Sequence, residues 1–110
     1  MTPLAPHLTK FLREHLPRER RASGHTCDAY AYSFQLLVTF AAGRLRKRPC
    51  LLQIQDLDVP MILAFLEHIE QDRGNTARSR NARLAAVKSF FRYLEHCEPT
   101  VLDQALRVHA

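Results

Sequence analysis

Residues 75–94 constrain the fold of this chain most strongly, because their side chains repeat with the period of a long helix that has two dissimilar faces. The apolar face consists of residues three or four positions apart: Leu84, Val87, Phe91 and Leu94, widened by Ala77, Phe90 and Cys97. The opposite face is cationic and consists of Arg78, Lys88 and Arg92, with Asn81 beside them. Such a helix must bury its apolar face against other elements.

The residues between the cations of this helix are small. Ala82, Ala85 and Ser89 stand there, so the helix could approach a phosphate backbone closely while long basic side chains reach around it. The alternative is a solvated helix face that carries a few arginines. The pattern alone leaves both interpretations open.

Other segments predict further helices around this one. A first helix opens at Pro3 or Pro6 and ends at Pro17, and a second runs from an N-cap at Thr26 to about Ala42, before Gly43. A third begins at Asp58 with Pro60 in its first turn and closes at Gly74. The basic helix runs from Asn75 or Thr76 to His96, and a terminal helix starts at Pro99 and reaches Val108.

Each predicted helix has an apolar face. The residues expected to face inward are Leu8, Phe11, Leu12 and Leu16 in the first helix, Tyr30, Phe34, Leu37, Val38 and Ala41 in the second, Ile62, Phe65, Leu66 and Ile69 in the third, and Val101, Leu102, Ala105, Leu106 and Val108 in the last. Leu51, Leu52 and Ile54 form a short apolar run that we interpret as an extended plug against the core. Since no hairpin signal is present, the prediction is an all-α, compact bundle of four to five helices.

Composition is consistent with one soluble domain that spans residues 1–110. The chain has 46% hydrophobic and 25% charged residues and a net charge of +5, which suits an anionic partner. It contains no apolar run of the roughly 20 residues that span a bilayer and no secretory pattern, so we expect a cytoplasmic protein without membrane contact.

The three cysteines form no metal-binding or disulfide pattern. Cys27, Cys50 and Cys97 are odd in number and lack Cys-x-x-Cys spacing, so no metal site and no cofactor are predicted. Cys27 and Cys97 are expected to be small buried or half-buried side chains. No Ser/His/Asp or Cys/His set has a spacing that indicates hydrolysis.

Several segments resemble the N-terminal core-binding domain of tyrosine recombinases, the phage integrases and Xer-type enzymes. Residues 76–94, above all 80–94, resemble its last long helix. Residues 23–30 are similar to the serine, threonine and tyrosine pattern that opens its second helix, and residues 57–66 resemble its third helix, which begins at an aspartate. The resemblance extends from about Leu8 to Val108 and implies a small SAM-like helical domain.

The resemblance also implies a function. In these recombinases the core-binding domain clamps double-stranded DNA together with a larger C-terminal catalytic domain, which has no counterpart in residues 1–110. The match of His15-Leu16-Pro17-Arg18 to the family's catalytic His-x-x-Arg pattern is interpreted as coincidence. We therefore expect no catalytic residues and no enzymatic activity in this chain by itself. Its partners would be duplex DNA, its own catalytic domain and other copies of the protein on DNA.

The family's second and fourth helices approach the major groove, which implies a set of DNA-contacting positions here. Carried over residue by residue, this set is His25, Thr26, Thr76, Arg78, Arg80, Asn81, Lys88 and Arg92. The start of the fourth helix also offers exposed amides and a positive dipole end that favour phosphate. Many members carry arginines after the residue that matches Tyr30, whereas this chain has residues 31–34 without charge. That departure shifts the prediction toward the fourth helix.

Structural roles compete for some of these positions. Thr26 could serve as an N-cap alone, and Arg80 reaches DNA only because it is near the helix end. Arg83 lies nearer the apolar face and is expected to form an ion pair with Glu67 or Glu70. The basic residues 44–48 are interpreted as a solvated loop, with phosphate contact as the alternative. Tyr32 is expected to face solvent or DNA, and Tyr30 and Tyr93 to lie at seams between helices.

Two other classes of function remain open from the sequence. A helical protein-interaction module could use the segment 101–108 to pack on a neighbouring subunit. A helix-turn-helix regulator could use Gly74-Asn75-Thr76 as the turn before a recognition helix, although residues 75–96 are long for that motif.

Overall fold

The computed structural model describes residues 2–19, 23–71 and 76–109. The α-helices in this part of the chain are α1 (Leu4–Lys10), α2 (Gly24–Leu45), α3 (Val59–Gln71), α4 (Ala77–Cys97) and α5 (Leu102–His109). A π-helix, η1 (Phe11–Glu19), continues α1, and the short 3₁₀ turns are η2 (Pro49–Leu51), η3 (Ile54–Asp56) and η4 (Pro99–Val101). The described residues form no strand beyond one isolated bridge, so the all-α prediction is confirmed.

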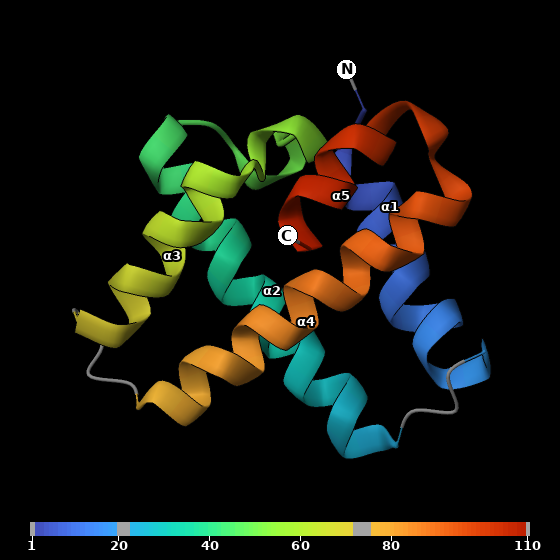
Figure 1. Cartoon of the computed structure of the whole chain (residues 1–110), viewed down its shortest axis with the longest axis horizontal. Helices are drawn as coiled ribbons and strands as arrows, with labels where there is room; N and C mark the ends of the chain where they lie inside the picture. Colours follow the sequence, from blue (N-terminus) through green and yellow to red (C-terminus); the bar gives the residue numbers. More distant parts are fainter. Residues whose placement is uncertain (1, 20–22, 72–75, 110) are drawn as a thin grey trace.

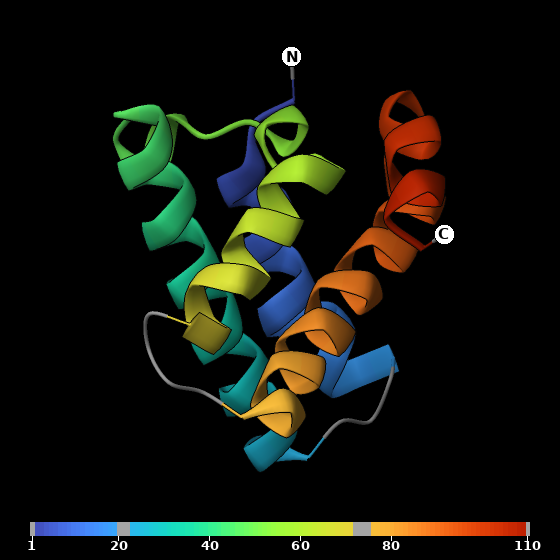
Figure 2. The same ribbon diagram turned by 60° about the vertical axis from the view of Figure 1, so that its left-hand side comes forward.

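Helices α2 and α4 cross near the middle of the molecule (Figure 1). Helix α3 lies on one side of this crossing and α1 with η1 on the other, while α5 folds back against the C-terminal half of α4 (Figure 2). Apolar side chains from all these elements meet between them. The largest fully buried ones are Phe11, Phe34, Phe65, Phe90, Phe91, Leu4, Leu37, Leu52, Ile54, Leu57, Leu66 and Ile69.

The first helical segment, α1 with η1, continues beyond Pro17. Leu4, Phe11 and Leu16 are buried along one side, as an amphipathic helix requires. The prediction that Pro17 ends the helix was wrong, because π-helical turns continue to Glu19 with the proline inside them. Proline removes one N–H donor, and its ring crowds the carbonyl four residues earlier, at Arg13; the helix ends two residues after Pro17.

Both ends of α2 differ from the prediction. Ser23 is the N-cap, because its Oγ accepts a hydrogen bond from the backbone N–H of Thr26 at 3.2 Å; Thr26 itself already lies inside the helix. Gly43 does not stop the helix, which runs on to Leu45. Arg46 stops it by adopting a left-handed conformation with φ of 55°, and the next amide bonds back to the carbonyl of Ala42. The predicted inner face is confirmed, with Phe34, Leu37 and Ala41 buried.

Residues 49–57 close one end of the bundle. The prediction that Leu51, Leu52 and Ile54 pack against the core is confirmed for two of the three residues. Leu52 and Ile54 are fully buried, whereas Leu51 is 57% exposed, which contradicts the prediction for that side chain. This segment pairs with the start of the chain: the Leu4 N–H donates to the Leu52 carbonyl and the Ile54 N–H to the Thr2 carbonyl. The pairing satisfies backbone groups that a buried segment cannot leave unpaired.

The two helices that follow begin where the sequence indicated. Asp58 caps α3, since its Oδ1 accepts from the Met61 N–H at 2.9 Å, and Thr76 caps α4 by accepting from the Ser79 N–H at 3.2 Å. The predicted inner face of α3 is buried in full, as are Val87, Phe90, Phe91 and Leu94 of α4, with Leu84 half-buried. Gly74 and Asn75, the predicted helix end and turn, lie outside the described residues.

A few predicted core positions are on the surface. Ala77 and Cys97, the first and last residues of α4, are exposed. In the terminal helix, Val101, Ala105 and Val108 are buried, but Leu102 and Leu106 are 42% and 53% exposed. The short α5 therefore buries a narrower face than the sequence predicted.

Candidate nucleic-acid interface

The N-terminal ends of α2 and α4 lie at the same end of the molecule, away from residues 49–57 and α5 (Figures 1 and 2). Each end is capped by a side-chain hydroxyl, Ser23 in α2 and Thr76 in α4. Neither first turn contains an acidic residue. Both helices therefore present unpaired amides and a positive dipole end to solvent, an arrangement that attracts anions.

The start of α2 carries two of the sequence-predicted DNA contacts. His25 and Thr26 are exposed in its first turn, and the Thr26 Oγ1 accepts a hydrogen bond from the Ser23 hydroxyl at 3.1 Å. Asp28, exposed one residue beyond Cys27, adds a negative charge to this helix. The start of α2 is therefore less cationic than that of α4.

One side of α4 carries a set of exposed residues that we call the α4 strip, although residues 86–91 within its length are buried or half-buried. It consists of Arg78, Asn81, Ala82, Ala85 and Arg92. Arg78 and Arg92 have no ion-pair partner among the residues that the structure describes. At about 1.5 Å per residue their α-carbons are roughly 21 Å apart, which exceeds the ~12 Å width of a major groove. The strip can therefore present two cations to phosphates on both sides of a groove.

Two other predicted contacts stand away from the α4 strip. Arg80 is half-buried, and its Nε lies 3.4 Å from the Glu70 Oε2 of α3. Lys88 is half-buried and lines a hollow between α3, α4 and α5, where Leu63 and Arg107 also contribute. Ser89, expected among the small residues of the cationic face, is 7% exposed, so that face is narrower than the helical period suggested.

Arg83 does not form the predicted ion pair with Glu67 or Glu70; Arg80 takes Glu70 instead. The Arg83 guanidinium crosses to α2, where its Nη1 donates to the Ser33 Oγ at 2.8 Å. Its Cζ lies 5.0 Å from the centroid of the Tyr32 ring. Helical phase placed Arg83 near the buried side correctly, but it carried no information on which neighbouring helix lies there.

In the segment that resembles a catalytic pattern, His15 and Leu16 pack against the core, whereas Pro17 and Arg18 are exposed. His15 lies against the rings of Phe11 and Tyr93, with centroids 5.7 and 4.7 Å away. Tyr30 and Tyr93 are half-buried around the same phenylalanine, as predicted for helix seams, and Tyr32 is 44% exposed. The cysteines are free. Cys27 is half-buried, whereas Cys97 is exposed, which contradicts the prediction for it. Within the described ranges no three His, Cys, Asp or Glu side chains are grouped for a metal ion.

The basic loop after α2 is exposed but partly neutralised. The Lys47 Nζ lies 3.0 Å from the Asp56 Oδ2, and the Arg44 guanidinium lies over the Phe40 ring at 5.8 Å. Arg46 and Arg48 are exposed. The loop stands at the C-terminal end of α2, where the dipole is negative, so it lacks the anion-attracting amides of the helix starts.

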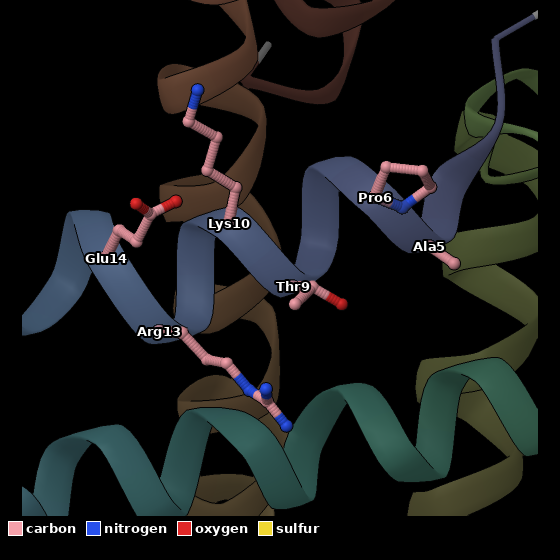
Figure 3. A pocket seen from close by; sticks show the side chains of 6 residues that line it. All are labelled: Ala5, Pro6, Thr9, Lys10, Arg13 and Glu14. Atoms are coloured by element: carbon pink, nitrogen blue, oxygen red, sulfur yellow. The ribbon is translucent and has the colours of Figure 1, made fainter.

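An open hollow on α1 and η1 differs in character from the helix starts (Figure 3). It is lined by Ala5, Pro6, Thr9, Lys10, Arg13 and Glu14. Lys10 and Glu14 extend from one side of the helix, while Arg13 extends toward α2. Charges of both signs meet at this hollow, and none of the residues predicted to contact DNA lines it.

Together these surfaces combine two exposed arginines, about 21 Å apart along α4, with two positive helix ends, and such an arrangement suits a linear polyanion. None of the helices in the described part of the chain has the length and apolarity that a bilayer crossing requires.

Comparison with known proteins identifies the family of the chain. Residues 8–98 match the family described as phage integrase, N-terminal SAM-like domain. A putative integrase/recombinase from Sinorhizobium fredii strain NGR234 is 43% identical over 105 residues, which cover 96% of this chain and 37% of the relative. A second one from the same strain is 44% identical over 107 residues, 97% of this chain and 32% of the relative.

A tyrosine recombinase, XerC of Rhizobium meliloti, is 38% identical over 80 residues, which cover 73% of this chain and 25% of that protein. No solved structure is significantly similar to the chain. The chain thus spans about a third of the length of the two Sinorhizobium relatives. Since the family match covers most of the chain and the helices follow in the expected order, the chain belongs to the phage integrase N-terminal SAM-like domain family.

Proposed function

We propose that this chain is the DNA-binding domain of a site-specific tyrosine recombinase and that it clamps duplex DNA without doing chemistry itself. The observation that carries the proposal is the α4 strip, in which Arg78 and Arg92 are exposed and the other exposed residues, Asn81, Ala82 and Ala85, are small or uncharged. Membership in the integrase family supports it. The names of the relatives support recombination as the process that the domain serves.

In this proposal the two helix starts and the α4 strip form one surface. The amides at the starts of α2 and α4 bind phosphates, with Thr76, His25 and Thr26 at the helix ends. Arg78, Arg80 and Asn81 contact the duplex in the first turns of α4, and Lys88 and Arg92 extend the contact along the helix. Because Arg80 and Lys88 are half-buried, their contributions are smaller than that of Arg78.

The proposal also implies two protein partners, a catalytic domain and further copies of the protein. A catalytic domain elsewhere in the full-length protein grips the opposite face of the duplex and carries the nucleophile. Further copies assemble on the same DNA in the cytoplasm. The affinity of this chain alone is therefore modest, because the grip of the whole protein depends on two tethered domains.

The proposal is tested with the 110-residue chain and a short duplex of mixed sequence, using fluorescence anisotropy at several salt concentrations. Arg78→Ala and Arg92→Ala should each weaken binding for all sequences and lower the slope of log affinity against log salt by about one. Lys88→Ala should have a smaller effect. Arg13→Ala is the matched control, because Arg13 is an exposed arginine of η1 and none of the predicted DNA contacts lines its hollow.

Equal losses in Arg78→Ala and Arg13→Ala would mean that only net charge matters, and the proposed surface would be wrong.

A second candidate is a protein-interaction module, favoured by the exposed leucines Leu63, Leu102 and Leu106. An apolar interface would respond little to salt, whereas contact with several phosphates weakens steeply. A helix-turn-helix regulator would instead depend on one sequence and would bind a random duplex far more weakly than its own site.

A further inference from the structure

The crossing of α2 and α4 is held by one cationic side chain. The Arg83 Nη1 of α4 donates to the Ser33 Oγ at 2.8 Å and to the Ala29 carbonyl at 3.4 Å. The guanidinium also lies over the ring of Tyr32, with its Cζ 5.0 Å from the centroid. One side chain of α4 therefore contacts three residues within about one turn of α2, two by hydrogen bonds and one by a cation–π contact.

Ser33 of α2 is held in this contact by its own hydrogen bonds. It is 2% exposed, and its hydroxyl donates to the Ala29 carbonyl at 2.9 Å while it accepts from Arg83. The hydroxyl thus uses both its donor and an acceptor site in a fixed arrangement. Because Ser33 is buried, it cannot touch a nucleic acid, so any influence on DNA binding must pass through the crossing.

The rest of the crossing consists of apolar contacts. Phe34 of α2 and Phe90 of α4 meet edge to face with centroids 5.4 Å apart, and Ala86 lies fully buried in the same seam. Apolar packing is non-directional and tolerates small rotations of one helix on another. Hydrogen bonds lose strength when they are bent, so the Arg83 contacts select one crossing angle among those that the apolar seam permits.

The crossing angle determines where the two helix starts stand. Ser33 lies nine residues after Gly24, and Arg83 lies six residues after Ala77, which correspond to about 14 and 9 Å of helix. A rotation of about 10° at the crossing would move the start of α2 by roughly 2 Å at that lever arm. Such a displacement exceeds the tolerance of a hydrogen bond to phosphate.

We infer that Arg83 is a positioning residue, which sets the angle between α2 and α4 so that both helix starts meet the same duplex. Arg83 acts through Ser33, Ala29 and Tyr32 and does not supply a phosphate contact of its own. The inference rests on the proposed function for its effect on DNA, while the geometry of the crossing can be tested without DNA.

The decisive variant is Ser33→Ala, because it removes the hydroxyl that holds Arg83 and changes no charge. Its duplex affinity should fall roughly tenfold, equivalent to about 1.4 kcal/mol, with an unchanged salt slope. Arg83→Lys should fall similarly, because an ammonium keeps the charge but cannot reproduce the planar fork. Ser89→Ala is the matched control: Ser89 is a buried serine of α4 whose Oγ has no partner among the described residues, and its variant should bind as the unaltered chain does.

The crossing itself is measured in the free protein by the distance between two spin labels. These are attached at Gly24→Cys and Ala77→Cys, the first residues of α2 and α4, in a chain whose three native cysteines are changed to serine. Both sites are exposed, and a side chain at Gly24 meets nothing within 4 Å. Ser33→Ala and Arg83→Lys should broaden or shift the distance distribution, and Ser89→Ala should not.

The outcomes separate the inference from the proposed function. An unchanged label distance in Ser33→Ala overturns the inference whatever the DNA result. A changed distance with unchanged affinity overturns the link to DNA. Normal binding by Ser33→Ala, together with a slope lowered by about one in Arg83→Met, would make Arg83 a direct phosphate contact instead. If the unaltered chain binds no duplex, the proposed function fails, and the label distance still decides whether Arg83 holds the crossing.

Discussion

At the scale of single residues, Phe11 is central to the core because its ring contacts several other aromatic rings at once. Its side chain is fully buried, and its ring lies 5.3 Å from that of Phe90, 5.4 Å from Tyr93 and 6.2 Å from Phe34. We expect Phe11→Ala to lower the free energy of unfolding by about 3–5 kcal/mol, which is a large part of the total for a small domain. Urea unfolding followed by circular dichroism measures this loss.

The control for this prediction is a large apolar side chain that packs against little. Leu51 is 57% exposed, so Leu51→Ala should change the free energy of unfolding by less than about 0.5 kcal/mol. Losses of similar size in both variants would contradict the central position of Phe11 in the core.

Arg80 and Arg83 show that a sequence does not reveal which neighbouring side chain a buried arginine contacts. Helical phase placed Arg80 and Arg83 near the buried side of α4, and both side chains do lie there in part. The phase could not tell which of them faces α3, because that depends on the directions in which neighbouring helices approach. Glu70 therefore pairs with Arg80, while Arg83 bonds to Ser33.

At the scale of elements, the end of α2 shows a local conflict that the structure resolves. Gly43 lies inside the helix and Arg46 takes the left-handed position after it, although glycine suits that position far better. We expect Gly43→Ala to raise the free energy of unfolding by about 0.5–1 kcal/mol, because alanine is the better helix former and its Cβ meets nothing within 4 Å. Thermal unfolding measures the gain.

Arg46→Gly is the companion variant and should also stabilise the chain, by up to about 1 kcal/mol, since it relieves the left-handed conformation of a residue with a Cβ. If Gly43→Ala destabilised the chain and Arg46→Gly had no effect, the helix would end at Gly43 in solution, as the sequence predicted. The two variants therefore decide the position of the helix end.

Helix order and inner faces could be predicted from the sequence, whereas helix ends could be predicted only in part. Asp58 and Thr76 were recognisable because each cap precedes a strong apolar period. Ser23 was missed in favour of Thr26, since either hydroxyl could cap a helix and the apolar period begins late. Pro17 and Gly43 were read as stops from local propensity, which the surrounding packing overrides.

At the scale of the whole molecule, both ends of the chain meet on residues 49–57. The Thr2 carbonyl accepts from the Ile54 N–H at 2.8 Å, and the Gln55 side chain bonds to the Thr2 hydroxyl at 3.2 Å. From the other end, the Gln104 Nε2 of α5 donates to two carbonyls of the same segment. These contacts join positions about 50 residues apart, so no periodicity in the sequence could have indicated them.

This junction and the starts of α2 and α4 lie at opposite ends of the bundle (Figures 1 and 2), so stability and binding at the helix starts should be separable. Gln104 donates to the carbonyls of Ile54 at 2.8 Å and Leu57 at 3.0 Å, and both of those residues are fully buried. Gln104→Ala leaves both carbonyls without this donor and should cost about 1–3 kcal/mol in the free energy of unfolding. Urea unfolding gives the cost, and anisotropy at a temperature where helicity is unchanged gives the duplex affinity.

The neighbouring variant Asp103→Asn breaks an exposed ion pair with Arg107 and should cost less than about 0.5 kcal/mol. Neither variant should change duplex affinity by more than twofold, because neither touches the starts of α2 and α4 or their crossing. A loss of affinity in Gln104→Ala, with the fold intact, would mean that strain at the junction reaches the DNA surface through α4. The helix starts would then be positioned by the whole bundle and not by the α2–α4 crossing alone.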